Sequence, residues 1–308
     1  MMAGACTGSG ISNAPTPHPS NVAPRARAVV ATVARYRLPA PIAREAVMGR
    51  GPVVTVAGGL LPGNGSTAAA YAIDLRSGHV TNRPNLQVPV HDTAGAAFGN
   101  RMLVIGGGNA FEQDVVQART GGAWSTIGHL PRARSDLSAV VVGKRAVVLG
   151  GFSGQNPAEA DILASDSGRT WATIGRLPVP VRYAATTAMG HKIWLFGGEQ
   201  SGQMKTAIQE VDSTSGRARM VGLMPSPLGH ASAMVLGRRI LSVGGRRDGN
   251  TIVDTMWWFD PAKHKLAPAG HLPMPLADAA AVTYRNRGYV IGGESPRNVD
   301  TVILVAPR

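Results

Sequence analysis

Residues 137–151 read LSAVVVGKRAVVLGG: an apolar run, a turn centred on Gly143, a second apolar run and a double glycine. The same double glycine recurs along the 308-residue chain at steps of 44 to 48 residues. The six pairs stand at residues 58–59, 106–107, 150–151, 197–198, 244–245 and 292–293. A fixed period of this size indicates a repeat architecture, in which each repeat is one supersecondary unit.

Each repeat contains four segments with the pattern of short strands. The turn residue seven positions before the double glycine is glycine in five repeats and Arg285 in the sixth. The β-branched runs on either side of this turn predict two buried strands. A polar loop follows, then a third segment such as TMWWFD (255–260) and, in other repeats, a fourth such as WSTIGHLP (124–131). Four antiparallel strands in roughly 40–50 residues are typical of one propeller blade, so we predict an all-β fold.

These features together resemble the kelch repeat. Double glycines end the second strands, an aspartate follows the third strand at Asp74, Asp212 and Asp260, and a tryptophan opens the fourth at Trp124 and Trp171. The resemblance covers residues 29–308 and implies a six-bladed β-propeller of four-stranded kelch-like blades. Ala, Val or Ile often replaces the aromatic residues of the kelch pattern, so the resemblance bears on the fold more than on the function.

The two ends of the repeat region predict how the propeller closes. Residues 29–39 look like a fourth strand without its first three, and their YRLP aligns with GHLP (128–131) and GRLP (175–178). Residues 299–307 look like a third strand without a fourth. We therefore expect strand 29–38 to pair with strand 299–306, which removes two open sheet edges and makes residues 25–308 one domain.

The first 24 residues have a different composition, rich in Gly, Ser, Thr, Pro and Asn, which predicts a flexible tether. Cys6 is the only cysteine of the chain, so no disulfide forms within it. AGAC before a Ser/Pro-rich segment resembles the lipobox of bacterial lipoproteins. That resemblance implies an exported protein, periplasmic or on the cell surface, with residues 1–24 as a lipoprotein linker and a lipidated Cys6. Only five residues precede Cys6, where a basic and apolar leader is usual, so an inert tail with a free thiol is the alternative.

A second resemblance lies in one blade. Residues 164–171, ASDSGRTW, resemble the Asp-box of sialidase-type propellers. We expect a hairpin in which Asp166 accepts backbone N–H groups, Gly168 takes a positive φ and Trp171 packs beneath. Asp-boxes stand on the outer hairpin of a blade, so the role that this resemblance implies is structural.

The candidate site is a ring at the mouth of the central channel. The position fourteen residues before each double glycine marks where an innermost strand begins, and it is polar in every repeat. These six residues are Arg44, Asp92, Asp136, Tyr183, His230 and Asp278. The preceding position adds His91 and Arg182, and the loops after the double glycines add Arg246 together with other polar residues such as Glu199 and Glu294. Mixed Arg, Asp, His and Tyr side chains suit a polyhydroxylated or anionic ligand; alternatively, they only solvate the channel mouth and pair with one another.

Several chemistries find no support in the sequence. A copper centre of the galactose-oxidase kind needs a cysteine in the propeller, and zinc needs a ligand spacing that His91 and His230 do not offer. There is no phosphate-binding loop and no nucleophile elbow. We therefore expect no metal and no cofactor.

Two classes of function remain. The first is a non-catalytic binding module that offers the ring to a glycan, an anionic ligand or a partner protein. The alternative is a sugar-active enzyme similar to sialidases or to the sialic-acid mutarotases built on kelch propellers. That resemblance would make Arg44 and Arg182 carboxylate clamps and Asp136 or Asp278 the acid. A further expectation is that Arg44 and Arg182, opposed across the ring, are incompletely neutralised and therefore favour an acidic ligand.

The net charge of +13 attracts polyanions in general. The basic residues are spread through turns such as GKR, GRR and RNR, without an aromatic platform for stacking bases, so nucleic acid is not the favoured partner. These turn-end cations would lie on the face opposite the ring, where an anionic membrane or wall polymer could rest.

Overall fold

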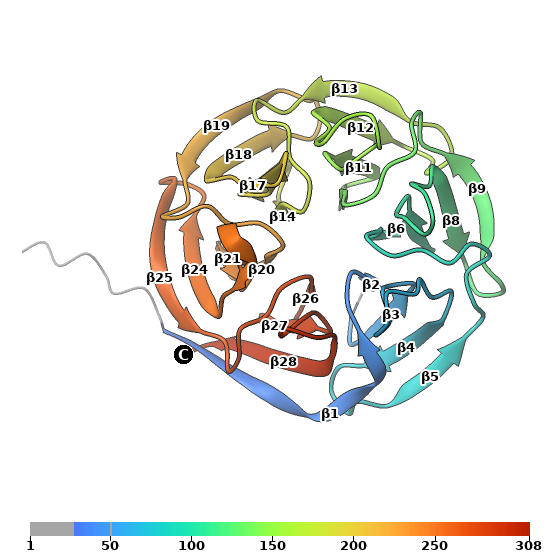
Figure 1. Ribbon diagram of the computed structural model, residues 1–308, viewed down its shortest axis with the longest axis horizontal. Helices are drawn as coiled ribbons and strands as arrows, with labels where there is room; N and C mark the ends of the chain where they lie inside the picture. Colours follow the sequence, from blue (N-terminus) through green and yellow to red (C-terminus); the bar gives the residue numbers. More distant parts are fainter. Residues whose placement is uncertain (1–27, 50) are drawn as a thin grey trace, which may run out of the picture.

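The structure is a computed structural model that describes residues 28–49 and 51–308. Six four-stranded antiparallel sheets stand around a central channel like the blades of a propeller (Figure 1). The predicted all-β, six-bladed fold is therefore confirmed. Residues 1–24 lie outside the described residues, so the tether and the lipidation of Cys6 stay predictions.

The first three blades each run outward from the channel in chain order. Blade 1 contains β2 (Ala46–Gly49), β3 (Val53–Ala57), β4 (Ala70–Asp74) and β5 (Val80–Arg83). Blade 2 contains β6 (Ala94–Phe98), β7 (Arg101–Ile105), β8 (Val115–Arg119) and β9 (Ser125–His129). Blade 3 contains β10 (Ser138–Val142), β11 (Arg145–Leu149), β12 (Asp161–Ser165) and β13 (Ala172–Arg176).

The next two blades carry an extra hairpin after the double glycine. Blade 4 contains β14 (Ala185–Met189), β15 (Lys192–Phe196), β18 (Ala207–Asp212) and β19 (Ala218–Leu223), with the hairpin β16 (Glu199–Gln200) and β17 (Gln203–Met204). Blade 5 contains β20 (Ser232–Leu236), β21 (Arg239–Val243), β24 (Thr255–Asp260) and β25 (Lys265–His271). Its hairpin is formed by β22 (Arg246–Arg247) and β23 (Thr251–Ile252), joined by the short 3-10 helix η1 (Asp248–Asn250).

Blade 6 is built from both ends of the propeller. It contains β26 (Ala280–Tyr284), β27 (Arg287–Ile291), β28 (Val299–Pro307) and, as its outer strand, β1 (Val29–Ile42). The register runs from Val29 opposite Pro307 to Ile42 opposite Val299. This confirms the predicted closure, and the paired strand extends a few residues beyond the expected 29–38.

The hydrophobic cores lie between neighbouring blades and are mostly aliphatic. Between blades 2 and 3, for example, Leu103 and Ile105 pack with Val148 and Leu163, all almost completely buried. Each double glycine lets two blades approach closely at the channel end. Gly151, with a φ of 105°, donates its N–H to the carbonyl oxygen of Val181 in the next blade at 3.0 Å. A Cβ atom on Gly150 would overlap that same carbonyl, which explains the glycine.

The Asp-box expectation needs one correction. Gly168 has a positive φ of 72° as predicted, and Trp171 packs against the core between blades 2 and 3. The residue that accepts the N–H of Gly168 is Ser165, through its hydroxyl at 2.7 Å. The carboxylate of Asp166 instead accepts a hydrogen bond from Nε of Arg145 at 2.9 Å. The hairpin is therefore held by a serine, and its aspartate belongs to a surface ion pair.

No helix within residues 28–49 and 51–308 is long and apolar enough to cross a membrane.

Candidate functional site: a ring of charged residues at the channel mouth

The six residues of the predicted ring form a closed circle of backbone hydrogen bonds. Each ring residue donates its N–H to the carbonyl oxygen of the ring residue in the preceding blade, at 2.9–3.0 Å. Every one of them is in the left-handed region, with φ between 51° and 59°. The circle comprises Arg44, Asp92, Asp136, Tyr183, His230 and Asp278. This shared backbone conformation points six side chains at one channel mouth, although left-handed φ is uncommon for residues other than glycine.

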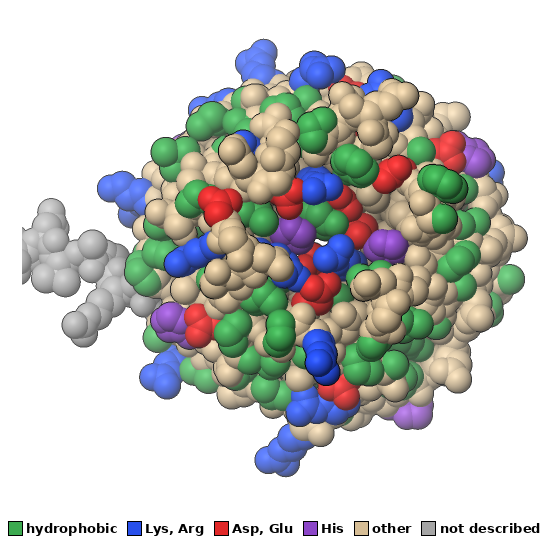
Figure 2. Space-filling view, viewed as in Figure 1, with side chains coloured by type: hydrophobic (Ala, Val, Ile, Leu, Met, Phe, Trp, Pro, Cys, Tyr) green, Lys and Arg blue, Asp and Glu red, His purple; other side chains and the backbone are tan. Residues whose placement is uncertain are grey.

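A second circle of positions brings further charges to the ring. The residue after each double glycine pairs with the residue before a ring residue, as Glu199 does with Arg182 and Glu294 with Ala277. Arg246 is placed in the same way, opposite Gly229. Figure 2 shows the acidic, basic and histidine side chains gathered at the centre of this face.

Each arginine of the site is paired with at least two carboxylates. Nε of Arg44 lies 3.0 Å from Oε1 of Glu294, and its Nη1 donates to Oδ2 of Asp92 at 3.2 Å. The two blades 4 and 5 repeat this arrangement. Arg182 contacts Asp136 at 3.2 Å and also Glu199, and Arg246 contacts Asp278 at 3.0 Å and also Glu294. The expectation that Arg44 and Arg182 are incompletely neutralised is therefore wrong, and it no longer supports an acidic ligand.

His230 is held between two acidic side chains. Its Nδ1 lies 2.6 Å from Oδ1 of Asp278, its Nε2 lies 3.2 Å from Oε2 of Glu199, and its ring stacks on Tyr183 at 3.9 Å between centroids. Burial opposes protonation, but the charge of Asp278 and the two hydrogen bonds outweigh it and raise the pKa of His230 to about 9. His230 is thus an imidazolium at neutral pH that joins blades 4, 5 and 6.

Two ring carboxyls favour their neutral form, whereas His230 favours its charged form. Burial, together with the charge of the neighbouring Asp92, raises the pKa of Asp136 to about 7. Burial also raises the pKa of Asp92 to about 6, although Arg44 opposes the shift. Because both side chains are more than nine-tenths buried and adjacent in the ring, ionising both at once is unfavourable. This pair holds a proton near neutral pH.

Glu45 lies one residue beyond the ring and lines the channel below it. It is 5% exposed, and neither carboxyl oxygen has a regular hydrogen-bond partner within the described part of the chain. Burial raises the pKa of Glu45 to about 8, although the amides of Glu45 and Ala280 partly oppose the shift. Below Glu45 the channel is lined by small side chains, such as Ala139, Ala184 and Ala281.

His91 stands at the edge of the site. Its Nδ1 shares a hydrogen bond of 2.8 Å with the hydroxyl of Ser66, and its Nε2 lies 3.5 Å from Oδ2 of Asp92. Burial and the charge of Arg44 lower the pKa of His91, so it is neutral where His230 is charged.

The space at the ring is divided in two. A pocket of about 380 Å³ lies above it, with Arg44, Glu199 and Glu294 below and the hairpins of blades 4 and 5 as a wall. The hairpins are joined because Oδ1 of Asp248 accepts the N–H of Met204 at 3.0 Å. A smaller space of about 130 Å³ lies inside the ring, between the ring residues and Glu45.

The structure thus brings together all nine residues that the sequence predicts for this site, with His91 at its edge. The structure adds Glu45, which the prediction did not include. Glu199 and Glu294, predicted among the loop residues of the mouth, contact the arginines directly. Both glutamates directly follow a double glycine, so the repeat register was enough to locate them in the sequence. Glu45 carries no such signal, because it reads as the first residue of an inner strand.

Comparison with known proteins agrees with this architecture. The family model described as KLHDC2/KLHL20/DRC7 Kelch-repeats domain matches residues 94–293. Since the match spans well over half of the chain, this protein belongs to the Kelch-repeat family.

A solved structure described as "Structure of YjhT" superposes with a TM-score of 0.79 at 18% sequence identity. The alignment covers 88% of this chain and 97% of that chain. At this identity the similarity shows the fold alone. None of the curated proteins compared with this chain matches it.

Proposed function

We propose that this protein is a kelch-type binding module whose ring face takes a polar ligand into the pocket above Arg44, Glu199 and Glu294. The observation that carries the proposal is the ion network, in which each arginine contacts at least two carboxylates. Because the charges of this network neutralise one another, the network does not strongly favour a charged ligand. Instead it presents fixed hydrogen-bond donors and acceptors, which suits the hydroxyl groups of a glycan or the polar segment of a partner protein.

The wall of the pocket supports the same proposal. Both hairpins, β16–β17 of blade 4 and β22–β23 of blade 5, contribute residues to the lining of the pocket. Arg247, on β22, is exposed and lines this wall without taking part in the ring network. It can therefore contact a ligand without any change in the ring.

The test is calorimetry of the full-length protein against neutral disaccharides, uronic acids, sialic acid and acidic peptides. Arg247→Ala should weaken the affinity for whichever compound of the panel binds by about tenfold or more, which is the effect expected from the loss of one charge-assisted hydrogen bond. Arg217→Ala, an exposed arginine in an outer turn of blade 4, is the matched control and should bind normally. If no compound of the panel binds, or if Arg247→Ala and Arg182→Ala both bind like the wild type, the ring is a structural closure of the channel and not a binding site.

A second candidate, a sugar-active enzyme, is favoured by one observation. The pKa of Asp136 is raised to about 7, so this carboxyl can give a proton at neutral pH. Asp278, the other carboxylate named for this role, is not suited to it, because His230 and Arg246 lower its pKa to about 2 against the effect of burial. Asp136→Asn should abolish turnover of an anomeric or glycosidic substrate, followed by NMR, while an Asp166→Asn control keeps it. If no sugar of the panel is converted, this candidate falls and the binding module stands.

Export and anchoring through Cys6 complete the proposal, and they rest on the sequence of the tether. Mass spectrometry of the native N-terminus tests them: an unmodified chain beginning at Met1 would exclude the anchor.

A further inference from the structure

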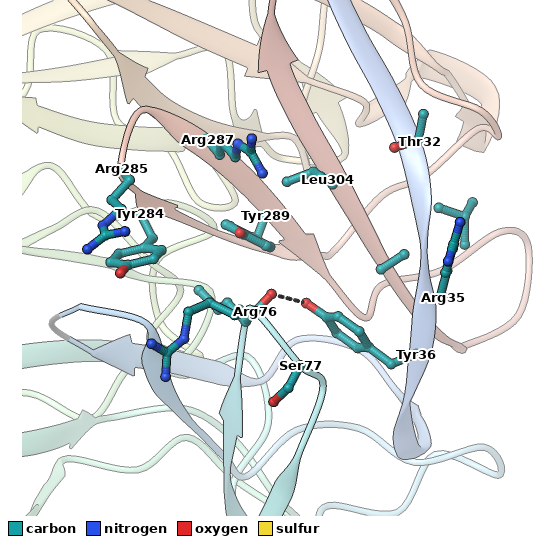
Figure 3. A pocket seen from close by; sticks show the side chains of 13 residues that line it. Thr32, Arg35, Tyr36, Arg76, Ser77, Tyr284, Arg285, Arg287, Tyr289 and Leu304 are labelled. Carbon is teal, nitrogen blue, oxygen red and sulfur yellow. Dashed lines mark hydrogen bonds between the residues drawn. The ribbon is translucent and has the colours of Figure 1, made fainter.

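A hollow of about 970 Å³ lies away from the ring, in the seam between blade 6 and blade 1. Its walls are β1, the outer turn of blade 1 at residues 75–77, and the inner turn of blade 6 around Arg285. Inner strands begin at the ring and end at the inner turns, so this groove opens toward the face opposite the ring. Figure 3 shows Tyr36 reaching from β1 toward blade 1, with Tyr284 and Arg285 across the gap.

The groove exists because of a tyrosine in a glycine position. In the outer strands of blades 2 and 3, Gly128 and Gly175 abut the next blade so closely that a Cβ atom would overlap its backbone. The aligned residue of blade 6 is Tyr36. Its ring lies against Gly78, and its hydroxyl donates to the carbonyl oxygen of Leu75 at 2.7 Å. Tyr36 therefore holds blades 6 and 1 apart, whereas blades 2 and 3 lie directly against the blades that follow them.

A second departure from glycine faces the same groove. The inner turn has glycine in blades 1 to 5, but blade 6 has Arg285 with a φ of 47°, followed by Asn286 with a φ of 59°. The left-handed region is unfavourable for an arginine. Residues in such strained backbone conformations cluster at functional sites, such as ligand-binding sites. The guanidinium of Arg285 lies 5.4 Å from the centre of the Tyr284 ring.

The groove is positively charged and not neutralised. Within residues 28–49 and 51–308, no carboxylate lies within ion-pairing distance of Arg285 or Arg287, whereas Arg76 is held by Asp74 at 2.6 Å. Three of the five tyrosines of the chain line the groove: Tyr36, Tyr284 and Tyr289. Free guanidinium groups bind carboxylate, sulfate or phosphate, and tyrosine rings pack against the flat face of a sugar ring.

We propose that the groove between blades 6 and 1 is a second binding site, which takes an anionic saccharide. The acidic group of the sugar pairs with Arg285 and Arg287, and its ring packs against Tyr284. A volume of about 970 Å³ accommodates more than one sugar unit, so the end or branch of an acidic polymer fits as well as a free disaccharide. This site is independent of the function proposed for the ring.

The experiment is calorimetry of the full-length protein with four probes: a sulfated disaccharide, a disaccharide of uronic acids, a neutral disaccharide of the same size and inorganic sulfate. Arg285→Gly restores the glycine that the other blades carry, so the fold should tolerate it. This variant and Arg287→Ala should each weaken binding of the acidic disaccharide by about tenfold. Arg239→Ala removes the arginine at the equivalent position of blade 5, outside the groove, and should bind like the wild type.

The proposal requires that at least one acidic disaccharide binds more tightly than both the neutral one and inorganic sulfate. It is overturned if neither acidic disaccharide binds at millimolar concentration, if inorganic sulfate binds equally well, or if Arg285→Gly leaves the affinity unchanged. The ring variant Arg182→Ala, tested with the same probes, should retain groove binding. Failure of this proposal is thus distinguishable from failure of the one for the ring.

Discussion

Nδ1 of His230 lies 2.6 Å from Oδ1 of Asp278, so that the ring residues of blades 5 and 6 form a buried ion pair. The pKa of His230 is raised to about 9 from 6.5, and that of Asp278 is lowered to about 2 from 3.8. The histidine stabilises the fold fully below about pH 6.5, and this contribution is lost as the pH rises through 9. The aspartate contributes above about pH 3.8 and loses its effect as the pH falls through 2.

The first prediction concerns this pair. His230→Asn should lower the free energy of unfolding at pH 6 by about 3–5 kcal/mol, because it leaves Asp278 and Glu199 buried without their imidazolium. The loss should shrink between pH 6.5 and 9, as the wild type loses the same charge. Denaturant unfolding at a series of pH values measures it. His271→Asn is the control, since His271 is exposed, and should change stability by less than about 1 kcal/mol. A pH-independent loss would mean that His230 is not charged in the folded protein.

The second prediction concerns Glu45. Its pKa is raised to about 8 from 4.5 by burial, so the folded protein loses stability as the pH rises from 4.5 through 8. Glu45→Gln keeps the size of the side chain and cannot ionise. It should match the wild type within about 1 kcal/mol at pH 5 and exceed it by roughly 2–4 kcal/mol at pH 9. Equal stability of the two proteins at both pH values would show that Glu45 ionises normally.

The third prediction concerns the closure of blade 6. Removing residues 1–40 deletes most of β1 and exposes the edge of β28, together with apolar side chains such as Ile303. We expect this truncation to unfold the propeller or to lower its melting temperature by more than about 10 °C. Removing residues 1–24 should leave the melting temperature unchanged. Calorimetry of both truncations decides, and equal melting temperatures would contradict the role of β1.

The fourth prediction separates two roles of Tyr36. Tyr36→Phe removes the hydrogen bond to the carbonyl of Leu75 and should destabilise the fold by about 0.5–1.5 kcal/mol. Tyr36→Gly also removes the ring packed against Gly78, which should destabilise by about 3–5 kcal/mol unless blades 6 and 1 close over the gap. Thermal unfolding measures both changes, and a crystal structure of Tyr36→Gly would show whether the seam closes. If the glycine variant costs no more than the phenylalanine variant, Tyr36 does not hold the seam apart.

Much of this architecture could be predicted from the sequence, because residues at the same position of each repeat occupy equivalent places in the propeller. One glycine column locates the inner strands, so six residues scattered from Arg44 to Asp278 fall into one ring. The pairings within that ring could not be predicted in the same way. Arg44 and Glu294 are 250 residues apart and meet only through the closure of the propeller. Which carboxylate each arginine selects depends on loop directions and rotamers that the period does not encode.

Two local errors have similar physical causes. Ser165 takes the capping role expected of Asp166, because Arg145 on the neighbouring strand competes for the carboxylate. Tyr36 aligned with Gly128 and Gly175, but the consequence of that exchange depends on the next blade, which for blade 6 lies at the other end of the chain. A substitution within one repeat can be read from the sequence. The groove that it opens depends also on the neighbouring repeat, so it could not be predicted from the substitution alone.

At the channel mouth, the backbone of the ring residues serves the fold, whereas their side chains are left to contact a ligand. Each of the six ring amides is already donated to a neighbouring blade, so a guest at this face meets no free ring amide and is read by side chains alone. Any residue that tolerates a left-handed backbone can occupy these positions while the circle stays closed. Evolution could therefore change the ring side chains one blade at a time, and with them the ligand specificity, while the propeller fold is retained.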